Sequence, residues 1–323
     1  MDSWSASRDG ALNSCERQYF YRYLTRARLN SQDRSLQEIA YLKDVKTIPI
    51  WQGEVFHDSA AGVLRALQAG QPVDHDQVIR DARDRMMSEW DYSSRNTPGP
   101  SSGGGARSGT ILFEHEYAEN PPQALRDGAV EFVVSALMRY MNWVDENRMG
   151  ERIGAAARAW IEPPLFGSGA AGFVLDGTRV FTKVDLALQD REGAFHIFDW
   201  KTGPPPTNYL NRIAQSEFQV AIYQLWPCIS MNAPLGLVQA HLVHVGSSPV
   251  QVISYKLDEE SRDATLSSIR RSIARMHQFA EAWESSGMQV TDLEFASSPG
   301  LCRRCSFKRL CLQSINTEGV DGF

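Results

Sequence analysis

Two consecutive strand–turn–strand patterns in residues 173–201 constrain the fold of this 323-residue chain more than any other feature. In the first, an Asp-Gly pair at residues 176–177 lies between two apolar runs, which is the strongest short-range signal for a β-hairpin. In the second, Asp-Arg-Glu-Gly at residues 190–193 separates two more predicted strands. Further strands are predicted at residues 236–244 and 250–256. Because helical patterns surround these strands, we expect an α/β fold.

Apolar residues at helical spacing predict the helices around this sheet. We expect one helix over residues 3–28, which contains Cys15, and a second that begins after Gly53 and carries His57 near its start. A loop rich in Gly and Ser at residues 97–109 separates further helical segments. The remaining helices are predicted at residues 125–147, 208–226 and 258–283, with Pro227 ending the second of these. We therefore expect one domain over residues 1–323, in which a helical lobe at 60–155 is inserted beside a sheet core at 155–256.

The net charge of −6 excludes a protein whose whole surface attracts nucleic acid, so any such surface must be local. Only six of the 33 basic residues are lysines, which leaves 27 arginines. The planar guanidinium group suits phosphate oxygens, but a genome rich in G and C would produce the same bias. No apolar run reaches the roughly 18 residues of a membrane helix, and the N-terminus lacks the regions of a signal peptide. We expect a soluble, cytoplasmic protein.

The second predicted hairpin brings acidic side chains together. If Arg191, Glu192 and Gly193 form a three-residue loop with Gly193 in the left-handed conformation, Asp185 lies opposite Asp199. The two-residue period of a strand then places Lys201 on the same face as Asp199. A slip of one residue in the register would separate these groups.

Two carboxylates and one ammonium group on one face predict a site for a divalent cation. The aspartates repel each other unless a cation lies between them, and Mg²⁺ and Mn²⁺ prefer carboxylate and water oxygens. A metal held there can activate water and stabilise charge on a phosphate, with Lys201 orienting that water or neutralising the phosphate oxygens. The alternative is a surface hairpin that carries ordinary solvated charges, and an isolated Asp-x-Lys favours that alternative.

Five short motifs follow one another along the chain. They are Gly53-x-x-x-His57, Glu162, Asp185, Asp199-Trp-Lys201-Thr-Gly203 and Gln219-x-x-x-Tyr223. None is specific alone, but the ordered set resembles the RecB-like nucleases of the PD-(D/E)XK superfamily. This resemblance implies a restriction-endonuclease-like fold, with a mixed central sheet flanked by helices, and metal-dependent cleavage of DNA.

The resemblance also implies a role for each matching side chain. Metal ligands would be His57, Asp185 and Asp199, and the catalytic set would be Asp185, Asp199 and Lys201. Gln219 and Tyr223 would contact DNA or support the site, and their spacing of four places them on one helical face. The chain departs from the family at two positions, since Thr182 stands for a frequent Gly and Val184 for a frequent Pro. Neither departure removes a ligand.

Two of the proposed ligands, Glu162 and His57, are supported less directly than the two aspartates. Glu162 is the weakest candidate, because Pro163 and Pro164 follow it and its distance from the hairpin is not fixed by local geometry. A lone histidine near a helix start is commonly a surface or core residue, so His57 owes its assignment to its place in the ordered set. Imidazole in a Mg²⁺ site indicates that Mn²⁺ also works.

Cysteines lie at both ends of the chain. Cys302, Cys305 and Cys311 could supply three thiolates, and Cys15 is the natural fourth ligand. The spacing resembles the iron–sulfur subset of RecB-like nucleases, such as AddB-type domains and CRISPR-associated single-domain nucleases. The resemblance implies a 4Fe-4S cluster in a module of residue 15 and residues 300–312, whereas the spacing alone permits Zn²⁺ equally well. Cys228 is expected to be a buried structural thiol.

Basic residues flank the cysteines and would join into one patch if the two ends meet. They are Arg17, Arg22, Arg26, Arg28, Arg303, Arg304, Lys308 and Arg309. Four aromatic residues lie beside them, namely Tyr19, Phe20, Tyr21 and Tyr23. Such a surface suits a single-stranded backbone with stacked bases, and we assign Arg17 and Arg22 to DNA binding. The alternative is a solvated helix face with its aromatic residues in the core.

The sequence therefore predicts a Mg²⁺- or Mn²⁺-dependent deoxyribonuclease that acts on single strands or DNA ends, as an exonuclease rather than an endonuclease. By family analogy its setting would be DNA repair, recombination or antiviral defence. The alternative is a DNA-binding adaptor subunit of a helicase–nuclease or spacer-acquisition complex, with little cutting activity. Since the chain lacks a Gly-x-x-x-x-Gly-Lys motif, a helicase would be a separate partner protein.

Overall fold

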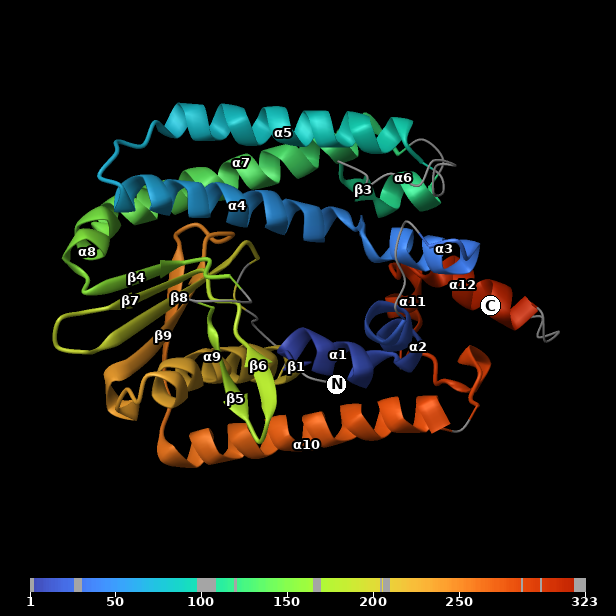
Figure 1. Ribbon diagram of the computed structural model, residues 1–323. Helices are drawn as coiled ribbons and strands as arrows, with labels where there is room; N and C mark the ends of the chain where they lie inside the picture. Colours follow the sequence, from blue (N-terminus) through green and yellow to red (C-terminus); the bar gives the residue numbers. More distant parts are fainter. Residues whose placement is uncertain are drawn as a thin grey trace.

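A mixed five-stranded sheet forms the centre of the protein, described by a computed structural model for residues 3–25, 31–97, 109–118, 121–164, 170–203, 205, 210–285, 287–296 and 298–316. The strand order is β10-β9-β8-β7-β4, and only β8 and β9 are parallel. The strands are β4 (Arg158–Ile161), β7 (Leu186–Gln189), β8 (Phe195–Lys201), β9 (Val238–His244) and β10 (Gln251–Lys256). With helices on both sides (Figure 1), this sheet confirms the expected α/β class.

Both predicted hairpins are present. Strands β5 (Gly172–Leu175) and β6 (Thr178–Phe181) are joined by Asp176 and Gly177, whose φ angles of 49° and 82° are those of a tight hairpin turn. Strand β1 (Ser3–Trp4) pairs in parallel with β6 and completes a second, three-stranded sheet.

The register of the second hairpin is the predicted one. Leu186 pairs with Phe198 and Gln189 with Phe195, so the next position along would place Asp185 opposite Asp199. The turn is held by Asp190, whose Oδ1 accepts the Ala194 N–H at 2.7 Å, and by Gly193, whose φ is 88°. Local turn chemistry thus sets which residues face each other at the far end of the strands.

Helices between residues 48 and 155 form a lobe on one side of the sheet. They are α4 (Ile48–Gln68), α5 (His75–Arg95), α6 (Phe113–Tyr117), α7 (Gln123–Glu146) and α8 (Met149–Ala155), with a short pair of strands, β2 (Val45–Lys46) and β3 (Ile111–Leu112), at their base. The predicted start of α4 after Gly53 was wrong. Thr47 is extended and Pro49 occupies the first turn, where its missing N–H costs nothing, so the helix begins at Ile48. Most of the predicted 97–109 loop lies outside the described residues.

Alternate residues of the sheet face two different cores. One face packs against α4, α7 and α8 through Leu186, Leu188, Phe198, Trp200 and Val243, and α5 covers the outer side of α4 and α7 (Figure 1). The other packs against α9 (Leu210–Ser230) and α10 (Glu259–Ser285) through Ala187, Phe195, Ile197, Ala240 and Leu242. This strict alternation fixes the register, since a slip of one residue would exchange both faces.

The expected stop of a helix at Pro227 was wrong, because α9 continues through it to Ser230. Proline removes one N–H bond and costs about 3 kcal/mol in a helix interior. The preceding residues Leu225 and Trp226 are fully buried in the core beside the sheet, and their burial offsets this cost. Cys228 consequently lies within the helix, half-buried, rather than at its end.

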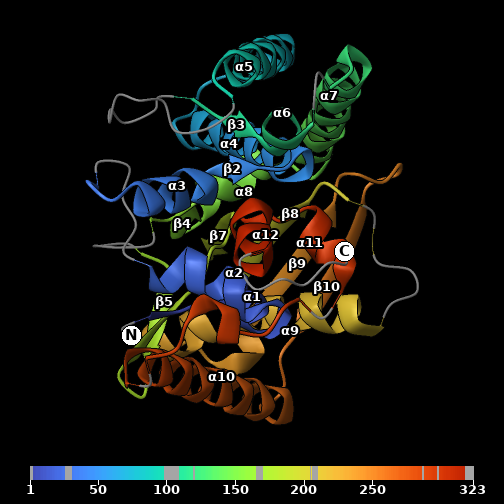
Figure 2. The ribbon, with the colours of Figure 1, turned by 90° about the vertical axis from the view of Figure 1, so that its right-hand side faces the viewer.

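The two ends of the chain meet in a third core. The predicted helix over residues 3–28 is divided into α1 (Ala6–Ser14), α2 (Glu16–Tyr19) and a π-helical turn η1 (Phe20–Leu24), because Cys15 is extended and its Sγ accepts the Gln18 N–H. This segment packs with α3 (Arg34–Lys43) and with the C-terminal η3 (Val290–Asp292), α11 (Pro299–Arg303) and α12 (Lys308–Asn316). Figure 2 shows α11 and α12 on the side that faces the viewer.

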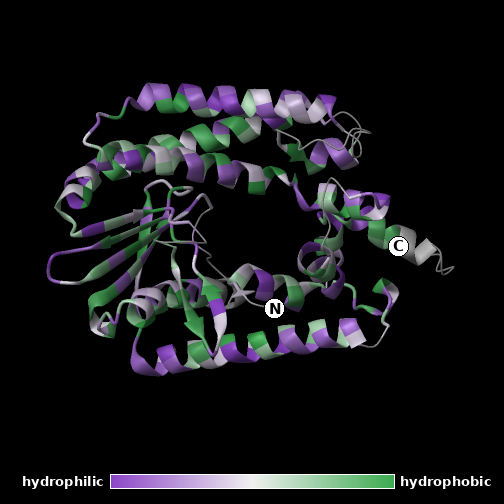
Figure 3. Ribbon diagram, in the orientation of Figure 1, coloured by the Kyte–Doolittle hydropathy of each residue, from purple (hydrophilic) through white to green (hydrophobic). Residues whose placement is uncertain are grey.

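The outer helices are amphipathic. Helix α5 buries Ala82, Met86, Trp90 and Ser93, at spacings of three and four, and α10 buries Thr265, Ile269 and Met276. Hydrophilic residues alternate with these along both helices in Figure 3. In the described part of the chain, no helix has the length and apolar character needed to span a membrane.

Gly246 lets the chain that follows β9 pass close to the end of β8. A Cβ at Gly246 would lie 1.9 Å from the carbonyl oxygen of Thr202, directly after Lys201. We expect Gly246→Ala to lower the free energy of unfolding by about 1–3 kcal/mol, because the backbone must shift. Gly128→Ala, at an exposed position of α7 where a Cβ would meet nothing within 4 Å, should instead raise it by about 0.5–1 kcal/mol. Urea unfolding of both variants checks this, and equal midpoints would contradict it.

Candidate active site

Asp185 marks the point at which β7 separates from β8. Its side chain is 5% exposed, and Oδ2 accepts the backbone N–H of Trp200 at 2.7 Å. The carboxylate therefore replaces the carbonyl that a continued strand would have offered. This bond holds Asp185 beside the last residues of β8, among them Asp199 and Lys201.

Asp199 is buried and forms an ion pair with Lys201. The Lys201 Nζ lies 2.6 Å from Asp199 Oδ2, without the angles of a hydrogen bond, and this oxygen has no other partner among the described residues. Burial raises the pKa of Asp199, and the charge of Asp185 adds to this, whereas the charge of Lys201 opposes it. Asp199 thus gains from any positive charge that enters the site.

Gln219 and Tyr223 of α9 close a ring of contacts around this pair. The Lys201 Nζ donates to Gln219 Oε1 at 3.0 Å, and Gln219 Nε2 donates to the Tyr223 hydroxyl at 2.5 Å. The Tyr223 hydroxyl donates to Asp199 Oδ1 at 3.1 Å. Because these contacts form a closed ring, they hold the side chains of Lys201 and Asp199 in one arrangement relative to each other.

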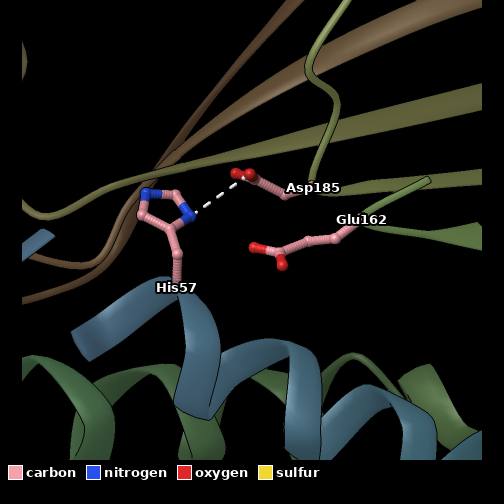
Figure 4. A group of neighbouring side chains, drawn as sticks. All are labelled: His57, Glu162 and Asp185. Carbon is pink, nitrogen blue, oxygen red and sulfur yellow. Dashed lines mark ion pairs between the residues drawn. The ribbon is translucent and has the colours of Figure 1, made fainter. Parts of the chain in front are cut away.

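His57 reaches the site from α4, on the lobe side. Its Nδ1 lies 3.2 Å from Asp185 Oδ1, and Figure 4 shows the ring directed at that carboxylate. Burial alone would lower the pKa of His57, but the contact with Asp185 and the charges of the neighbouring acids together raise it. The imidazole therefore sits in a negative environment.

Glu162 also faces this group, although sequence geometry could not place it. It follows β4 with a φ of 41°, and its N–H donates to the Asp185 carbonyl at 2.9 Å, which extends the β4–β7 pairing by one residue. Burial and the charge of Asp185 raise the pKa of Glu162. Its carboxylate points toward His57 and Asp185 in Figure 4.

These side chains fit a divalent cation. One ligand atom from each of His57, Glu162 and Asp185 lies within 4.8 Å of the other two, the only such set among the described residues. Asp199 lies outside this set, and its Oδ2, which lacks a hydrogen-bond partner among the described residues, is the oxygen that Lys201 Nζ approaches at 2.6 Å. Two or three carboxylates with one imidazole suit Mg²⁺ or Mn²⁺. A bound cation would supply an activated water and positive charge for a phosphate.

The four cysteines expected to bind a cluster lie in the region where the chain ends meet. Burial raises the pKa of Cys305 to about 11 and that of Cys311 to about 12, and the nearby Cys15 contributes to both. Gln18 Nε2 lies 3.9 Å from Cys305 Sγ. Yet no three of these sulfur atoms, all within the described residues, lie within 4.8 Å of one another. The thiols are neighbours without forming a ligand set.

The prediction that Arg17 binds DNA requires correction. Arg17 is 3% exposed, and its guanidinium donates to the carbonyls of Leu293 at 3.0 Å and Thr291 at 2.9 Å. It joins the two chain ends instead. Tyr19, Phe20 and Tyr21 are also buried, Tyr19 in the core that includes α9 and α10 and the other two in the third core, so they cannot stack on bases. Arg22 remains half-exposed, while Arg26 and Arg28 lie outside the described residues.

Several residues that shape the site carry no local sequence signal. The backbone of Trp200 orients Asp185, and Arg65 approaches Glu162 at 3.9 Å. His244 pairs with Lys201 across β8 and β9, and burial lowers its pKa, with the charge of Lys201 contributing. A neutral His244 adds no charge beside Lys201. The position of His244 beside Lys201 follows from the parallel pairing of β8 with β9, which are far apart in the sequence.

A mixed sheet that presents two buried acids and a lysine beside a histidine and a third acid defines the class of metal-dependent nucleases. The model of the PD-(D/E)XK nuclease superfamily matches residues 3–312. The chain therefore belongs to the PD-(D/E)XK nuclease superfamily, and it is a metal-dependent nuclease. A comparison with curated proteins found no match.

Metal binding should weaken as the pH falls, beginning above the ordinary pKa of about 6.5 for histidine. A metal needs neutral imidazole and ionised carboxylates, and the pKa values of His57, Glu162 and Asp199 are all raised, so protons compete at higher pH. Titration with Mn²⁺ by calorimetry between about pH 6 and 8 measures this. In the His57→Gln variant, the affinity for Mn²⁺ should depend less on pH. If the affinity of the unmutated protein for Mn²⁺ does not change with pH, the ligand set is contradicted.

Proposed function

We propose that the protein is a deoxyribonuclease that hydrolyses phosphodiester bonds in single strands or at DNA ends, as an exonuclease. The observation that carries this proposal is the closed ring of Lys201, Gln219, Tyr223 and Asp199 beside His57, Glu162 and Asp185. A surface hairpin with solvated charges would not bury both aspartates or lock their lysine partner. This arrangement favours an active enzyme.

Each side chain of the site has its own role in the proposed hydrolysis. His57, Glu162, Asp185 and Asp199 would hold Mg²⁺ or Mn²⁺, which supplies an activated water. Lys201 is 29% exposed, so its ammonium can donate to that water or to a phosphate oxygen while Gln219 fixes its direction. The attacking water would release a proton to solvent as its oxygen bonds to phosphorus, and the leaving oxygen would take up a proton from solvent as its own bond to phosphorus breaks. Tyr223 keeps Asp199 in place.

The choice of DNA, and of single strands or ends, rests on the resemblance to RecB-like nucleases. The setting in DNA repair, recombination or antiviral defence has the same basis, as do a helicase partner and a cytoplasmic location. An adaptor subunit with little cutting activity is the competing proposal. It is disfavoured because an adaptor needs neither a buried Asp199 nor its ion pair with Lys201.

We also propose a 4Fe-4S cluster at Cys15, Cys302, Cys305 and Cys311, as in AddB-type nucleases, with Zn²⁺ as the alternative. Support comes from the spacing and from the docking of the two chain ends, which Arg17 and other polar contacts maintain. Arg309 pairs with Glu38 and Glu116, and the Tyr117 hydroxyl donates to the Ser306 carbonyl at 2.5 Å. A cluster would need the sulfurs to close around it, after losing their protons.

The nuclease proposal predicts that Asp199→Ala and Lys201→Ala each reduce Mn²⁺-dependent degradation of labelled single-stranded DNA by at least about a hundredfold. Asp199→Ala leaves Lys201 unpaired but 29% exposed to water, and Lys201→Ala leaves a buried carboxyl whose raised pKa favours its neutral form, so circular dichroism is used to verify that both variants keep the fold. Asp263→Ala and Lys256→Ala, both on the exposed surface, are the matched controls and should leave the rate unchanged. Equal rates in all five proteins would refute the site.

The cluster proposal predicts that protein purified without oxygen is brown and contains iron, with broad visible absorbance. Cys311→Ser should lose colour and iron, because one ligand is missing. Cys228→Ser lies in α9, in another core, and should keep both. Colourless protein that contains zinc would refute the cluster and leave the nuclease proposal intact.

A further inference from the structure

A pocket of about 480 Å³ opens between the helical lobe and the C-terminal helices, away from the residues that hold the metal. Its walls come from the start of α4, from α6, from the start of α7 and from the cysteine module. The lining residues are Thr47, Ile48, Pro49, Phe113, Glu114, Tyr117, Ala118, Leu125, Arg304 and Lys308. Nothing in the catalytic ring uses this pocket.

The lining combines apolar walls with two cations at one side. Ile48, Pro49, Phe113 and Leu125 offer flat and aliphatic surface, and Leu125 is 40% exposed. Arg304 is exposed, and the Lys308 ammonium lies over the rings of Phe113 and Tyr117, at 4.6 Å and 4.1 Å from their centroids. A ligand with an apolar body and an attached anionic group would fit both the apolar walls and the two cations.

The pocket also contains one acid, Glu114, whose charge is balanced in part by the nearby Arg304. Glu114 accepts the N–H of Ile48 at 3.3 Å, and its other oxygen, Oε2, is buried without a hydrogen-bond partner among the described residues. Burial raises the pKa of Glu114. Arg304 and Lys308 together with Glu114 leave the lining of the pocket with one net positive charge.

The pocket is connected to the catalytic site by one straight element. Ile48 and His57 both belong to α4 and are separated by nine residues, which is about 14 Å at 1.5 Å per residue. At the spacing of a duplex strand, about 3.4 Å per nucleotide, this distance corresponds to at most about four nucleotides. A strand bound at the metal site could thus reach the pocket.

We infer that this pocket receives one nucleotide of the single-stranded substrate, a few positions from the bond that is cut. The base lies against the apolar and aromatic walls, and Arg304 and Lys308 hold the adjoining phosphates. This assignment rests on the proposed deoxyribonuclease function and adds a second binding point for the same strand. It gives the local basic surface that a chain with a net charge of −6 requires.

Salt dependence of binding tests the phosphate contacts. Anisotropy of a labelled single-stranded oligonucleotide is measured with chelator present, so that no cleavage occurs. Each lost contact should reduce the slope of log affinity against log salt by about 0.7, so Arg304→Gln loses about 0.7 and the Arg304→Gln, Lys308→Gln double variant about 1.4. The control Arg271→Gln, Lys256→Gln removes the same charges from α10 and β10 and should change nothing.

A fluorescent base tests the position of the pocket. With 2-aminopurine placed at successive positions, we expect quenching only within about four nucleotides of the cut end. Phe113→Leu should remove that quenching while Mn²⁺-dependent kcat stays within about twofold and KM rises. If the double variant misfolds, the single variant Arg304→Gln still tests one phosphate contact, because Arg304 is exposed and its replacement does not disturb a core.

The outcomes separate the two proposals. Unchanged salt slopes in both pocket variants, or quenching independent of position, would overturn the pocket assignment in a protein that still cuts DNA. A free deoxynucleoside monophosphate that binds as tightly as the strand would also overturn it, by assigning the pocket to a small ligand. Original protein that neither binds nor cuts DNA would instead refute the deoxyribonuclease itself.

Discussion

Burial of two carboxylates at the point where β7 leaves β8 is the constraint around which the rest of the structure is arranged. Asp185 takes the Trp200 N–H that a continued strand would have bonded, and Asp199 has Lys201 and Tyr223 as partners. Removing such charges from water costs several kcal/mol for each, so they persist only with compensating contacts. The end of the strand, Lys201 and α9 supply these contacts, and each oxygen of Asp199 is in contact with one of them.

The helical lobe gives this acidic site its remaining ligand. One face of the sheet packs against α4 and α7, where Trp200 contacts Tyr140 and Trp143 through their rings. This packing sets the position of α4, and with it His57, while the alternate residues of the same strands face α9. A single sheet thus carries an aromatic core on one side and the ring of polar contacts at its end. The same helix extends toward the cysteine module, so the lobe links the metal site to the joined chain ends.

Sequence reasoning succeeded where a local rule determined the geometry and failed where packing competed with it. Turn chemistry at residues 190–193 predicted the pairing of β7 and β8, and helical spacing predicted that Gln219 and Tyr223 share a face. Pro227 did not end α9, because burial of Trp226 outweighs one lost hydrogen bond. Arg17 and its aromatic neighbours were assigned to a surface, but they fill a core made by segments nearly 300 residues apart.

The sequence by itself determined the α/β class, both hairpins, and the set of Asp185, Asp199 and Lys201 on neighbouring strands. These follow from contacts between residues fewer than about twenty apart, where backbone geometry leaves few choices. The resemblance already implied that the cysteine-bearing ends meet, but only the tertiary structure decided that Glu162 faces His57 and that His244 lies beside Lys201. Such pairs depend on the packing of whole elements against one another, and the free energy that selects them is spread over many buried side chains.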